Sequence, residues 1–435
     1  MSLTDGQEKA YTYMQCGYNV FLSGKAGTGK SYVLQQFINE KREEKQNVLV
    51  CAPSGIAAIH VTGVTIHRAF QAPREPIIGP PKKLPPVVEE ADILIVDEIS
   101  MCRIDLFDYI AQTIQKANNK RGKYGELPIQ VIVVGDFCQL PPVILDKDKE
   151  ILDEYYGEDI GNAYAFQSKY WEKFEFKNVV LTDILRQKDM MFVKALNQAR
   201  MGDVRCVEFL NQNSANYPIE NGIYIYSTNR KVKELNARKL GLIDNPLWEF
   251  EAREEGIVNE TDRMTDKILN LKVGARVMML TNDIENKWQN GSLGTILNIE
   301  IRQIKIHLDN GNDVSVRPYD WSIERYVVVE QQIGKQVVKV LEKEEIGTFE
   351  QFPLKLAYAI TMHKSQGQTY ERANISPEAW APGQLYVALS RGREIPKMHL
   401  LSNIEKRQLL VSPEVIEFYR NIEMEGEQLS LNLGC

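Results

Sequence analysis

The sequence predicts an α/β protein with two parallel-sheet domains and a small β-rich insertion in the second. Residues 19 to 40 form a short apolar strand, a glycine-rich loop and a helix, as at the start of a parallel α/β unit. Far downstream, another apolar strand begins at Leu356 and is followed by a polar loop. Between them, short apolar runs in residues 271 to 330 alternate with Asn-Gly and Asp-Asn-Gly turn signals, which is typical of a small closed barrel.

The composition is that of a globular protein, with 43% hydrophobic and 26% charged residues. At 435 residues the chain is long enough for two to four folding units. A net charge of -7 excludes a broadly basic surface, so any nucleic-acid site must be a local groove. The six cysteines have no paired CxxC spacing, and we expect reduced thiols, not zinc ligands.

The segment GKAGTGKS has the Gly-x4-Gly-Lys-Ser spacing of a phosphate-binding loop between a strand and a helix. Its glycines let successive N–H groups face a β-phosphate, and the helix N-terminus adds partial positive charge. We expect the Lys30 side chain to reach the β- and γ-phosphates and the Ser31 hydroxyl to bind magnesium. The expected nucleotide-binding residues here are Gly24, Ala26, Gly27, Thr28, Gly29, Lys30 and Ser31.

Two further apolar strands end in polar residues at the carboxyl edge of the same sheet, where doubly wound folds bind ligands. Residues 93 to 96 end in Asp97 and Glu98, which predicts a magnesium ligand and a base for water. Residues 131 to 134 lead to Gln139, which would lie near the γ-phosphate. Taken alone, the acidic pair also fits a solvated strand end, and Gln139 also fits a turn before two prolines.

Downstream, the strand at residues 356 to 360 leads into TMHKSQGQT, and residues 384 to 393 read QLYVALSRGR. An arginine from a neighbouring domain stabilises charge on a transferring phosphoryl group and makes hydrolysis depend on domain closure. Arg391 is the candidate for that arginine.

With these motifs the chain resembles the Pif-one-type helicases, in the RecD-like branch of the superfamily-one helicases. The resemblance runs from about residue 4 to residue 402. It rests on GKAGTGKS, APSGIAAI with GVTIHRAF, DILIVDEIS, VVGDFCQLPPV, LTDILRQ, TMHKSQGQTY and LYVALSRGR, which occur in this order.

The resemblance implies that ATP and Mg²⁺ bind between two RecA-like domains. It implies that Gln7 binds the adenine and that Arg186 and Arg391 approach the nucleotide from the second domain. Gly367 would approach the nucleotide with its backbone, beside Gln366. The catalytic set is Lys30, Asp97, Glu98, Gln139, Arg186 and Arg391, and the metal ligands are Ser31 and Asp97.

The same resemblance implies single-stranded DNA as a partner. Backbone N–H groups, hydroxyls and short basic side chains suit phosphates, and His67 or Phe70 would stack on a base. His67 also fits a structural histidine, and Phe70 fits a core position. The implied contacts are Pro53, Ser54, Gly55, Thr65, His67, Phe70, His363, Lys364 and Ser365.

The expected domain boundaries follow from the order of these motifs. The first RecA-like domain covers residues 1–63 and 87–180, and a wedge insertion covers residues 64–86. Because residues 71 to 86 are proline-rich, they also fit a plain surface loop. The second RecA-like domain covers residues 181–275 and 351–435, and an SH3-like β-barrel covers residues 276–350. The basic run from Lys116 to Lys123 is expected to be a solvated loop, with a phosphate contact as the alternative.

The function expected from the resemblance is that of an ATP-dependent DNA helicase that moves 5′-to-3′ on a single strand. Its partners would be single-stranded DNA and duplex or G-quadruplex DNA with a 5′ tail, and the chain would act as a monomer. Without a signal or an apolar run long enough to span a bilayer, it should be cytoplasmic, associated with the nucleoid in a bacterium, and not membrane-bound. A nucleotide switch that binds a protein partner and a small-molecule phosphotransferase are the alternatives from other classes.

Overall fold

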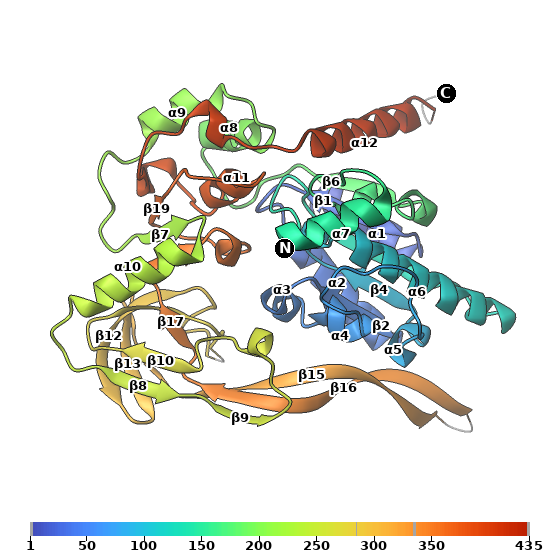
Figure 1. The fold of residues 1–435 in the computed structure, drawn as a ribbon, viewed down its shortest axis with the longest axis horizontal. Helices are drawn as coiled ribbons and strands as arrows, with labels where there is room; N and C mark the ends of the chain where they lie inside the picture. The colour runs from blue at the N-terminus through green and yellow to red at the C-terminus, as the bar shows by residue number, and fades with distance from the viewer. Residues whose placement is uncertain (1–2, 284, 334–335, 433–435) are drawn as a thin grey trace.

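The computed structural model describes residues 3–283, 285–333 and 336–432, and it confirms an α/β protein built on two parallel sheets (Figure 1). The first sheet has six strands in the order β3-β2-β4-β5-β1-β6, and all neighbouring strands are parallel. Its strands are β1 (Val20–Gly24), β2 (Val48–Ala52), β3 (Val64–Thr65), β4 (Ile93–Val96), β5 (Gln130–Gly135) and β6 (Lys177–Leu181).

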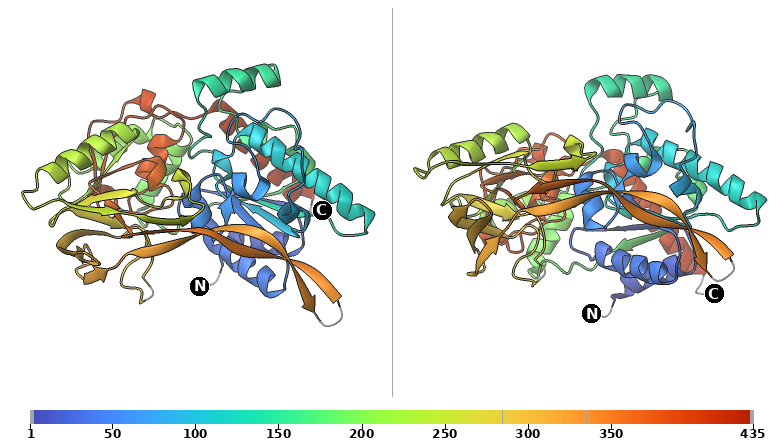
Figure 2. Two further views of the ribbon diagram at one scale, coloured as in Figure 1. Left: turned by 60° about the horizontal axis from the view of Figure 1, so that its bottom comes forward. Right: turned by 90° about the horizontal axis from the view of Figure 1, so that it is seen from below.

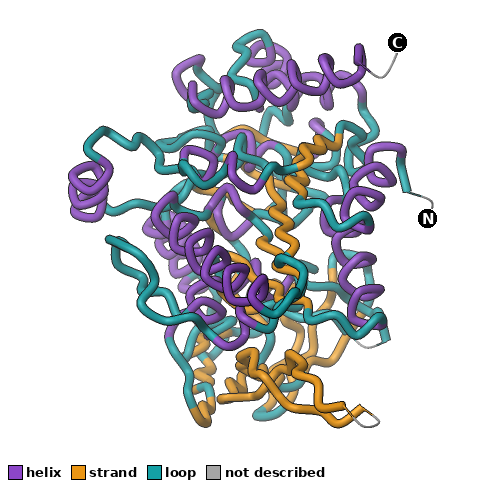
Figure 3. The backbone as a smooth tube through the Cα atoms, turned by 90° about the vertical axis from the view of Figure 1, so that its right-hand side faces the viewer, coloured by secondary structure: helices purple, strands orange, loops and turns teal. Residues whose placement is uncertain are grey.

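Helices cover both faces of this sheet (Figure 3). Successive strand residues point to opposite faces, so Phe21 packs in one core cluster and Leu22 in another. A capping box between Thr4 and Gln7 begins the first helix. The helices are α1 (Asp5–Gln15), α2 (Lys30–Glu43), α3 (Gly55–His60), α4 (Ile66–Phe70), α5 (Pro86–Glu89), α6 (Ile104–Lys123) and α7 (Asp146–Tyr156).

The second sheet is smaller and also parallel, with the strand order β18-β7-β19-β20. These strands are β7 (Ile223–Tyr226), β18 (Ala359–Thr361), β19 (Ala373–Ile375) and β20 (Met398–Leu400). The helices of this part of the chain are α8 (Met190–Arg200), α9 (Cys206–Asn213), α10 (Asn229–Gly241) and α11 (Gln384–Leu389). Single 3-10 turns are η1 (Ile99–Met101), η2 (Ala165–Gln167), η3 (Glu172–Phe174), η4 (Glu260–Asp262), η5 (His363–Ser365), η6 (Ile395–Lys397) and η7 (Lys406–Gln408).

The last helix, α12 (Pro413–Asn432), packs on the first domain and not on the second, to which we assigned it (Figure 1). Tyr419 and Val415 belong to the core cluster that contains Phe21 of β1. The ring of Phe418 stacks on that of Phe166, with centroids 4.3 Å apart. The expected range 351–435 for the second domain is therefore wrong at its C-terminal end.

The β-rich insertion is longer than the expected range 276–350, because its strands begin at Trp248 and end at Leu356. A five-stranded antiparallel sheet in the order β14-β13-β12-β11-β17 and the pair β10-β8 share one hydrophobic core. The strands are β8 (Trp248–Glu251), β10 (Ile268–Leu271), β11 (Arg276–Met279), β12 (Leu293–Glu300), β13 (Gln303–Leu308), β14 (Asp313–Val316) and β17 (Leu354–Leu356).

A long hairpin leaves this insertion and lies along the first domain (Figure 2). It consists of β15 (Tyr319–Ile333) and β16 (Gln336–Gln351), and β9 (Arg253–Gly256) pairs with β16. Tyr326 of β15 is buried in the core cluster of the first domain. The side chain of Asn47, just before β2, donates to the carbonyl of Lys339 and accepts from the N–H of Leu341.

Two local expectations in the first domain also need correction. Residues 64 and 65 form β3 and pair with β2, so they belong to the first sheet and not to a wedge insertion. The segment from Lys116 to Lys123 is the end of helix α6 and not a loop. There Arg121 forms an ion pair with Asp92, with 3.0 Å between the nitrogen and oxygen atoms.

Within the described ranges, no helix is long and apolar enough to cross a membrane. Cys16, Cys51, Cys102, Cys138 and Cys206 are free thiols, as expected, and Cys435 lies outside the described residues.

Candidate nucleotide and nucleic-acid site

The phosphate-binding loop joins β1 to α2 and has the backbone that its glycines allow. Gly27 and Gly29 have φ angles of 81° and 79°, in the left-handed region that favours glycine. Lys30, the first residue of α2, donates from Nζ to the carbonyl oxygen of Gly24 at 2.7 Å. Burial lowers the pKa of Lys30, whereas Asp136, Glu98 and Asp97 act in the opposite direction. The Lys30 ammonium group is therefore hydrogen-bonded to the backbone of the phosphate-binding loop.

Two side chains close over these glycines. A Cβ atom at position 27 would lie 2.6 Å from Cβ of Arg186, and one at position 29 would lie 2.5 Å from Nε2 of Gln7. Gln7 donates from Nε2 to the carbonyl of Thr28 at 3.0 Å and accepts from the N–H of Thr4. The Gln7 amide therefore braces the loop, and an adenine would compete for these two bonds.

The acidic pair follows β4 at the sheet edge. Burial raises the pKa of Asp97 to about 6, and burial together with Asp97 raises the pKa of Glu98 to about 7. Glu98 has a φ of 50°, a costly conformation for a residue with a side chain, and its N–H donates to Oδ1 of Asp97 at 2.9 Å. Strained, desolvated carboxyl groups of this kind are typical of catalytic sites.

Gln366 of the second domain connects directly to this edge. Its Nε2 atom donates to Oε2 of Glu98 at 2.9 Å and to Oε1 of Gln139 at 3.3 Å. Gln139 is buried in the segment after β5. Gln366 of the second domain thus links the segments that follow β4 and β5 of the first domain.

Helix α11 supplies a further contact that the sequence reading missed. The hydroxyl of Tyr386 accepts from the N–H of Ala26 in the phosphate-binding loop at 3.0 Å. Gly383, the N-cap of α11, lies against the segment after β5, where a Cβ would come within 2.1 Å of the Gln139 carbonyl oxygen. The motif LYVALSRGR contained Tyr386, but nothing local pointed to its partner.

The two predicted arginines lie on the second-domain side of the same interface. Arg391 is 1% exposed and donates to the carbonyls of Val387, Ser365 and Gln368. Burial, followed by the charge of Arg186, lowers its pKa to about 9. Arg186 donates to the carbonyl of Ser390 at 3.2 Å and to that of Gly367 at 3.4 Å, and Gly367 itself is exposed.

A buried ion pair beside the phosphate-binding loop was also missed. Asp136, directly after β5, forms an ion pair with Arg200 of α8, with 2.8 Å between Oδ1 and Nη2. The hydroxyl of Tyr419 of α12 donates to the same carboxylate at 3.3 Å and lies 2.6 Å from Oγ of Ser23. Arg200 holds the pKa of Asp136 below its usual value even though burial acts to raise it.

The residues around Lys30 fit a magnesium nucleotide. Among the described residues, no group of three or more His, Cys, Asp or Glu side chains could hold a metal ion alone. Mg²⁺ characteristically takes one or two carboxylates together with substrate phosphates and water. Asp97 and the exposed Ser31 hydroxyl provide that kind of incomplete set.

The expected DNA contacts of the first domain lie at the ends of β2 and β3. The Ser54 hydroxyl accepts from the N–H of Ala57, and the Thr65 hydroxyl caps α4 by accepting from the N–H of Arg68. Each hydroxyl keeps its own proton for a phosphate oxygen. Pro53 and Gly55 are partly exposed in the same turn.

The insertion covers this turn. A Cβ on Gly55 would lie 3.0 Å from the carbonyl oxygen of Thr261. Arg68 forms an ion pair with Asp262 at 2.9 Å and donates to the carbonyl of Glu324. A strand that binds at Gly55 and Thr65 must therefore compete with these contacts.

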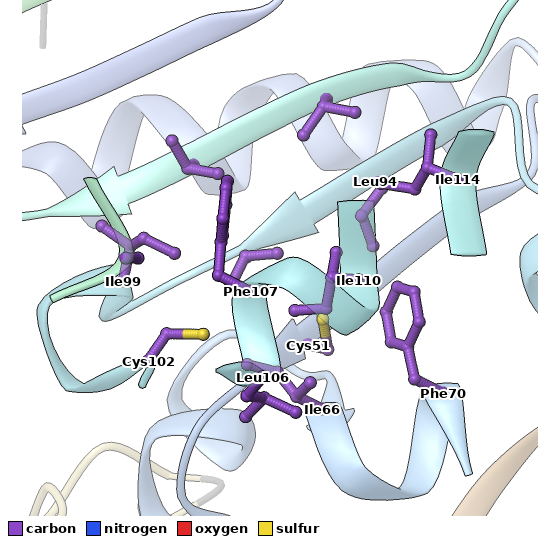
Figure 4. Packing of buried hydrophobic residues seen from close by; sticks show 14 of the residues in the cluster. Cys51, Ile66, Phe70, Leu94, Ile99, Cys102, Leu106, Phe107, Ile110 and Ile114 are labelled. Atoms are coloured by element: carbon purple, nitrogen blue, oxygen red, sulfur yellow. The ribbon is translucent and has the colours of Figure 1, made fainter. Parts of the chain in front are cut away.

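Phe70 cannot stack on a base in this structure, so that expectation is wrong. Its side chain is fully buried among Ile66, Leu94 and Ile110 in the core under α4 and α6 (Figure 4). Burial of an aromatic ring in the core is favoured strongly enough to explain the position. His67 remains partly exposed, with Nδ1 3.3 Å from the carbonyl oxygen of Ala72, and burial lowers its pKa.

In the second domain the expected contacts form the turn η5 after β18. Lys364 is exposed and His363 is partly buried. Ser365 is fully buried, and its hydroxyl donates to the carbonyl of Met362 at 2.7 Å, so the side chain faces the protein interior. The structure thus leaves His363 and Lys364 as the accessible side chains of this motif.

Comparisons with known proteins identify relatives of this chain in sequence and in structure. Residues 2–205 match the family model described as PIF1-like helicase. The chain is 32% identical to the ATP-dependent DNA helicase Pif1 of Bdellovibrio bacteriovorus, and the match covers 97% of this chain and 93% of that protein.

Crystal structures of Pif1 from Bacteroides sp resemble the fold over 98% of both chains. The complex with ADP-AlF4 has 33% sequence identity and a TM-score of 0.82, and the complex with ssDNA has 34% identity and a TM-score of 0.68. The unliganded Bacteroides structure has a TM-score of 0.81, so the parts of this chain are arranged more as in the unliganded and ADP-AlF4 structures than as in the complex with ssDNA. The extent of these matches shows that the chain belongs to the PIF1-like helicases.

Proposed function

We propose that this protein is an ATP-dependent DNA helicase that moves along single-stranded DNA and unwinds duplexes. The observation that carries the proposal is the bridge from Gln366 of the second domain to Glu98 and Gln139 of the first. A bridge at this point makes the catalytic edge of one domain depend on the position of the other. The Pif1 relatives named as ATP-dependent DNA helicases support the same conclusion.

In the proposed mechanism, the amides of residues 24 to 31 and the Lys30 ammonium bind the phosphates of ATP. Glu98, with a pKa raised to about 7, accepts the proton of the attacking water. Arg391 and Arg186 stabilise the negative charge that develops on the transferred phosphoryl group. Mg²⁺, held by Ser31 and Asp97, would neutralise phosphate charge when bound.

The contribution of Arg391 depends on domain closure. Arg391 has a lowered pKa and bonds only to uncharged groups of its own domain among the described residues, so its charge is not neutralised there. Moving Arg391 toward phosphate is therefore electrostatically favourable. We propose that Gln139 and Gln366 sense this approach, since they already contact each other across the interface.

For the strand, we propose contacts with Ser54, Gly55 and Thr65 in the first domain and with His363 and Lys364 in the second. The hydroxyls and backbone N–H groups would bind phosphates, which gives little sequence preference. Alternate closing and opening of the domains on ATP would then move the strand from one set of contacts to the other. We propose travel in the 5′-to-3′ direction, as a monomer, on duplex or G-quadruplex substrates with a 5′ tail.

The proposal is tested by steady-state ATP hydrolysis with and without oligothymidine, followed by unwinding of duplexes that carry a 5′ or a 3′ tail. We expect strong stimulation, and unwinding from the 5′ tail alone. Unstimulated hydrolysis without unwinding would favour a nucleotide switch that binds a protein partner. Unwinding from the 3′ tail alone would contradict the direction.

Two variants test the site itself. Lys30→Ala should abolish hydrolysis, and Arg391→Ala should abolish hydrolysis while nucleotide and strand binding remain. The matched control is Arg393→Ala, two residues further on, where an exposed arginine pairs with Glu371. Normal hydrolysis by Arg391→Ala would show that the proposed two-domain site is wrong.

A further inference from the structure

Trp380 is a large aromatic residue that the structure leaves open to solvent. It lies in the loop after β19, and 60% of its surface is exposed. Its ring is stacked against that of His363, with 6.2 Å between the ring centroids and 26° between their planes. Trp380 lies outside the sequence motifs and the site residues described above.

The position of Trp380 is fixed by hydrogen bonds at both ends. Its indole Nε1 donates to the carbonyl of Ser227 at 3.4 Å. Its backbone N–H donates at 3.0 Å to Oε1 of Gln384, whose side chain is fully buried. A ring that is held in one orientation loses little conformational entropy when a ligand binds to it.

Three loops meet at this point. Ser227 follows β7, His363 follows β18 and Trp380 follows β19, and these strands are parallel neighbours in the order β18-β7-β19. The rings therefore lie at the carboxyl edge of the second sheet, where open α/β sheets bind their ligands.

The chemistry around the rings suits a nucleotide unit of a single strand. Burial lowers the pKa of His363, which favours its neutral, aromatic form at pH 7. Lys364 is exposed directly beside it, and burial together with Lys364 lowers the pKa of Lys355 to about 8. Over the residues that the structure describes, neither lysine has an ion pair with an acidic side chain. Aromatic faces beside unpaired cations bind a base and its phosphate together.

We propose that Trp380 and His363 form a stacking site for one unpaired nucleobase, with Lys364 placed for the adjoining phosphate. The inference rests on the proposed single-strand binding and adds to it a base contact on the second domain. This site would tolerate any base, because each base offers a flat π face.

The same loop leads directly to the nucleotide interface. Gln384, whose side chain accepts a hydrogen bond from the Trp380 N–H, is the first residue of α11. Two residues later the Tyr386 hydroxyl accepts from the Ala26 N–H of the phosphate-binding loop, and Arg391 follows α11. Trp380 is thus hydrogen-bonded to the helix that contains Tyr386 and precedes Arg391, the second-domain groups at the ATP site.

The experiment compares binding of a short oligothymidine with binding of an abasic oligomer of the same length, by fluorescence anisotropy in one buffer. Trp380→Ala should weaken oligothymidine binding roughly 5- to 100-fold and leave abasic binding nearly unchanged. Trp380→Phe keeps a ring and should retain most of the affinity. Tyr217→Ala removes an aromatic that is 81% exposed elsewhere and should bind like the wild type.

Each outcome has a separate meaning. If wild-type protein does not bind oligothymidine, the proposed function fails, and this inference fails with it. If the wild type binds and Trp380→Ala binds equally well, only the stacking site is overturned. Equal weakening on both oligomers would also overturn it, because the loss would not depend on the base.

Discussion

Removal of Arg200 should destabilise the protein far more than removal of a surface arginine. Arg200→Ala takes away the guanidinium that pairs with Asp136, whose side chain is fully buried. Hydrogen bonds to Asp136 from the Tyr419 hydroxyl, the Cys138 N–H and the Gln139 amide would remain, but none of these donors is positively charged. The variant therefore leaves a buried carboxylate without its directly paired cation, with only the more distant charge of Lys30.

The size of the effect follows from that burial. Breaking a buried ion pair by removing one partner costs about 3 to 5 kcal/mol. For a cooperative unit of about 200 residues, with an unfolding entropy of about 2.1 cal/mol/K per residue, this lowers the melting temperature by about 7 to 12 °C. Thermal unfolding followed by circular dichroism at pH 8 measures the shift. The matched control is Arg205→Ala, where 79% of the arginine side chain is exposed and no measurable shift is expected.

The pH dependence identifies the cause. In the wild type the pKa of Asp136 is lowered, so its stabilising contribution is present above the unfolded value of about 3.9 and is lost only as the pH falls through the lower, folded value. Without Arg200, burial is opposed only by Lys30 and the Cys138 N–H, so we expect the pKa of Asp136 to rise. The variant then regains stability as the pH falls from 8 toward 5, because the carboxyl group is protonated.

Two results would refute this reasoning. One is a melting temperature within about 2 °C of the wild type at pH 8, which would mean that the pair contributes little net stability. The other is a deficit that is the same at pH 8 and pH 5. The double variant Arg200→Ala with Asp136→Asn should be more stable than Arg200→Ala alone, since the unpaired charge is gone.

Three further results are expected. Gly383→Ala should lower the DNA-stimulated ATPase rate about tenfold or more, because a Cβ would press on backbone carbonyls of the other domain. The control Gly125→Ala, at a position with nearly the same φ and no neighbour within 4 Å, should have the ATPase rate of the wild type. Asp262→Asn should tighten oligothymidine binding about 2- to 10-fold in an anisotropy titration, since the ion pair with Arg68 holds the insertion over the strand site. The value of kcat/KM for ATP should rise as the pH increases through about 7, where Glu98 loses its proton; a flat profile from pH 6 to 8 would contradict its role as the base.

The sequence was most informative where a function is carried by consecutive residues. The loop from Gly24 to Ser31 sets its own backbone through glycines, so its conformation could be predicted without knowing any partner. The same holds for the carboxyl pair after β4, whose position follows from the apolar run before it. Both predictions depend on local chain geometry and on the parallel order of the strands.

Contacts between distant segments were not predictable in this way. Arg200 lies in an ordinary amphipathic helix, and Tyr419 lies in a helix that returns to the first domain. Nothing near either residue indicates that both reach Asp136. Phe70 was difficult to predict for a different reason. An aromatic residue that stacks on a base and one that packs in the core can have the same neighbours in sequence, and only the packing of the folded chain distinguishes them.

The interface between the two domains combines contacts of different strength, and this difference bears on how ATP can act. Facing the phosphate-binding loop, Gln366 and Tyr386 make neutral or singly charged hydrogen bonds across the interface. Each such bond contributes only about 0.5 to 3 kcal/mol and can be exchanged for one to a phosphate oxygen. The Asp136–Arg200 pair beside the same loop is buried and would be costly to separate. Nucleotide binding can therefore exchange the hydrogen bonds of Gln366 and Tyr386 while the Asp136–Arg200 pair keeps the two domains in contact.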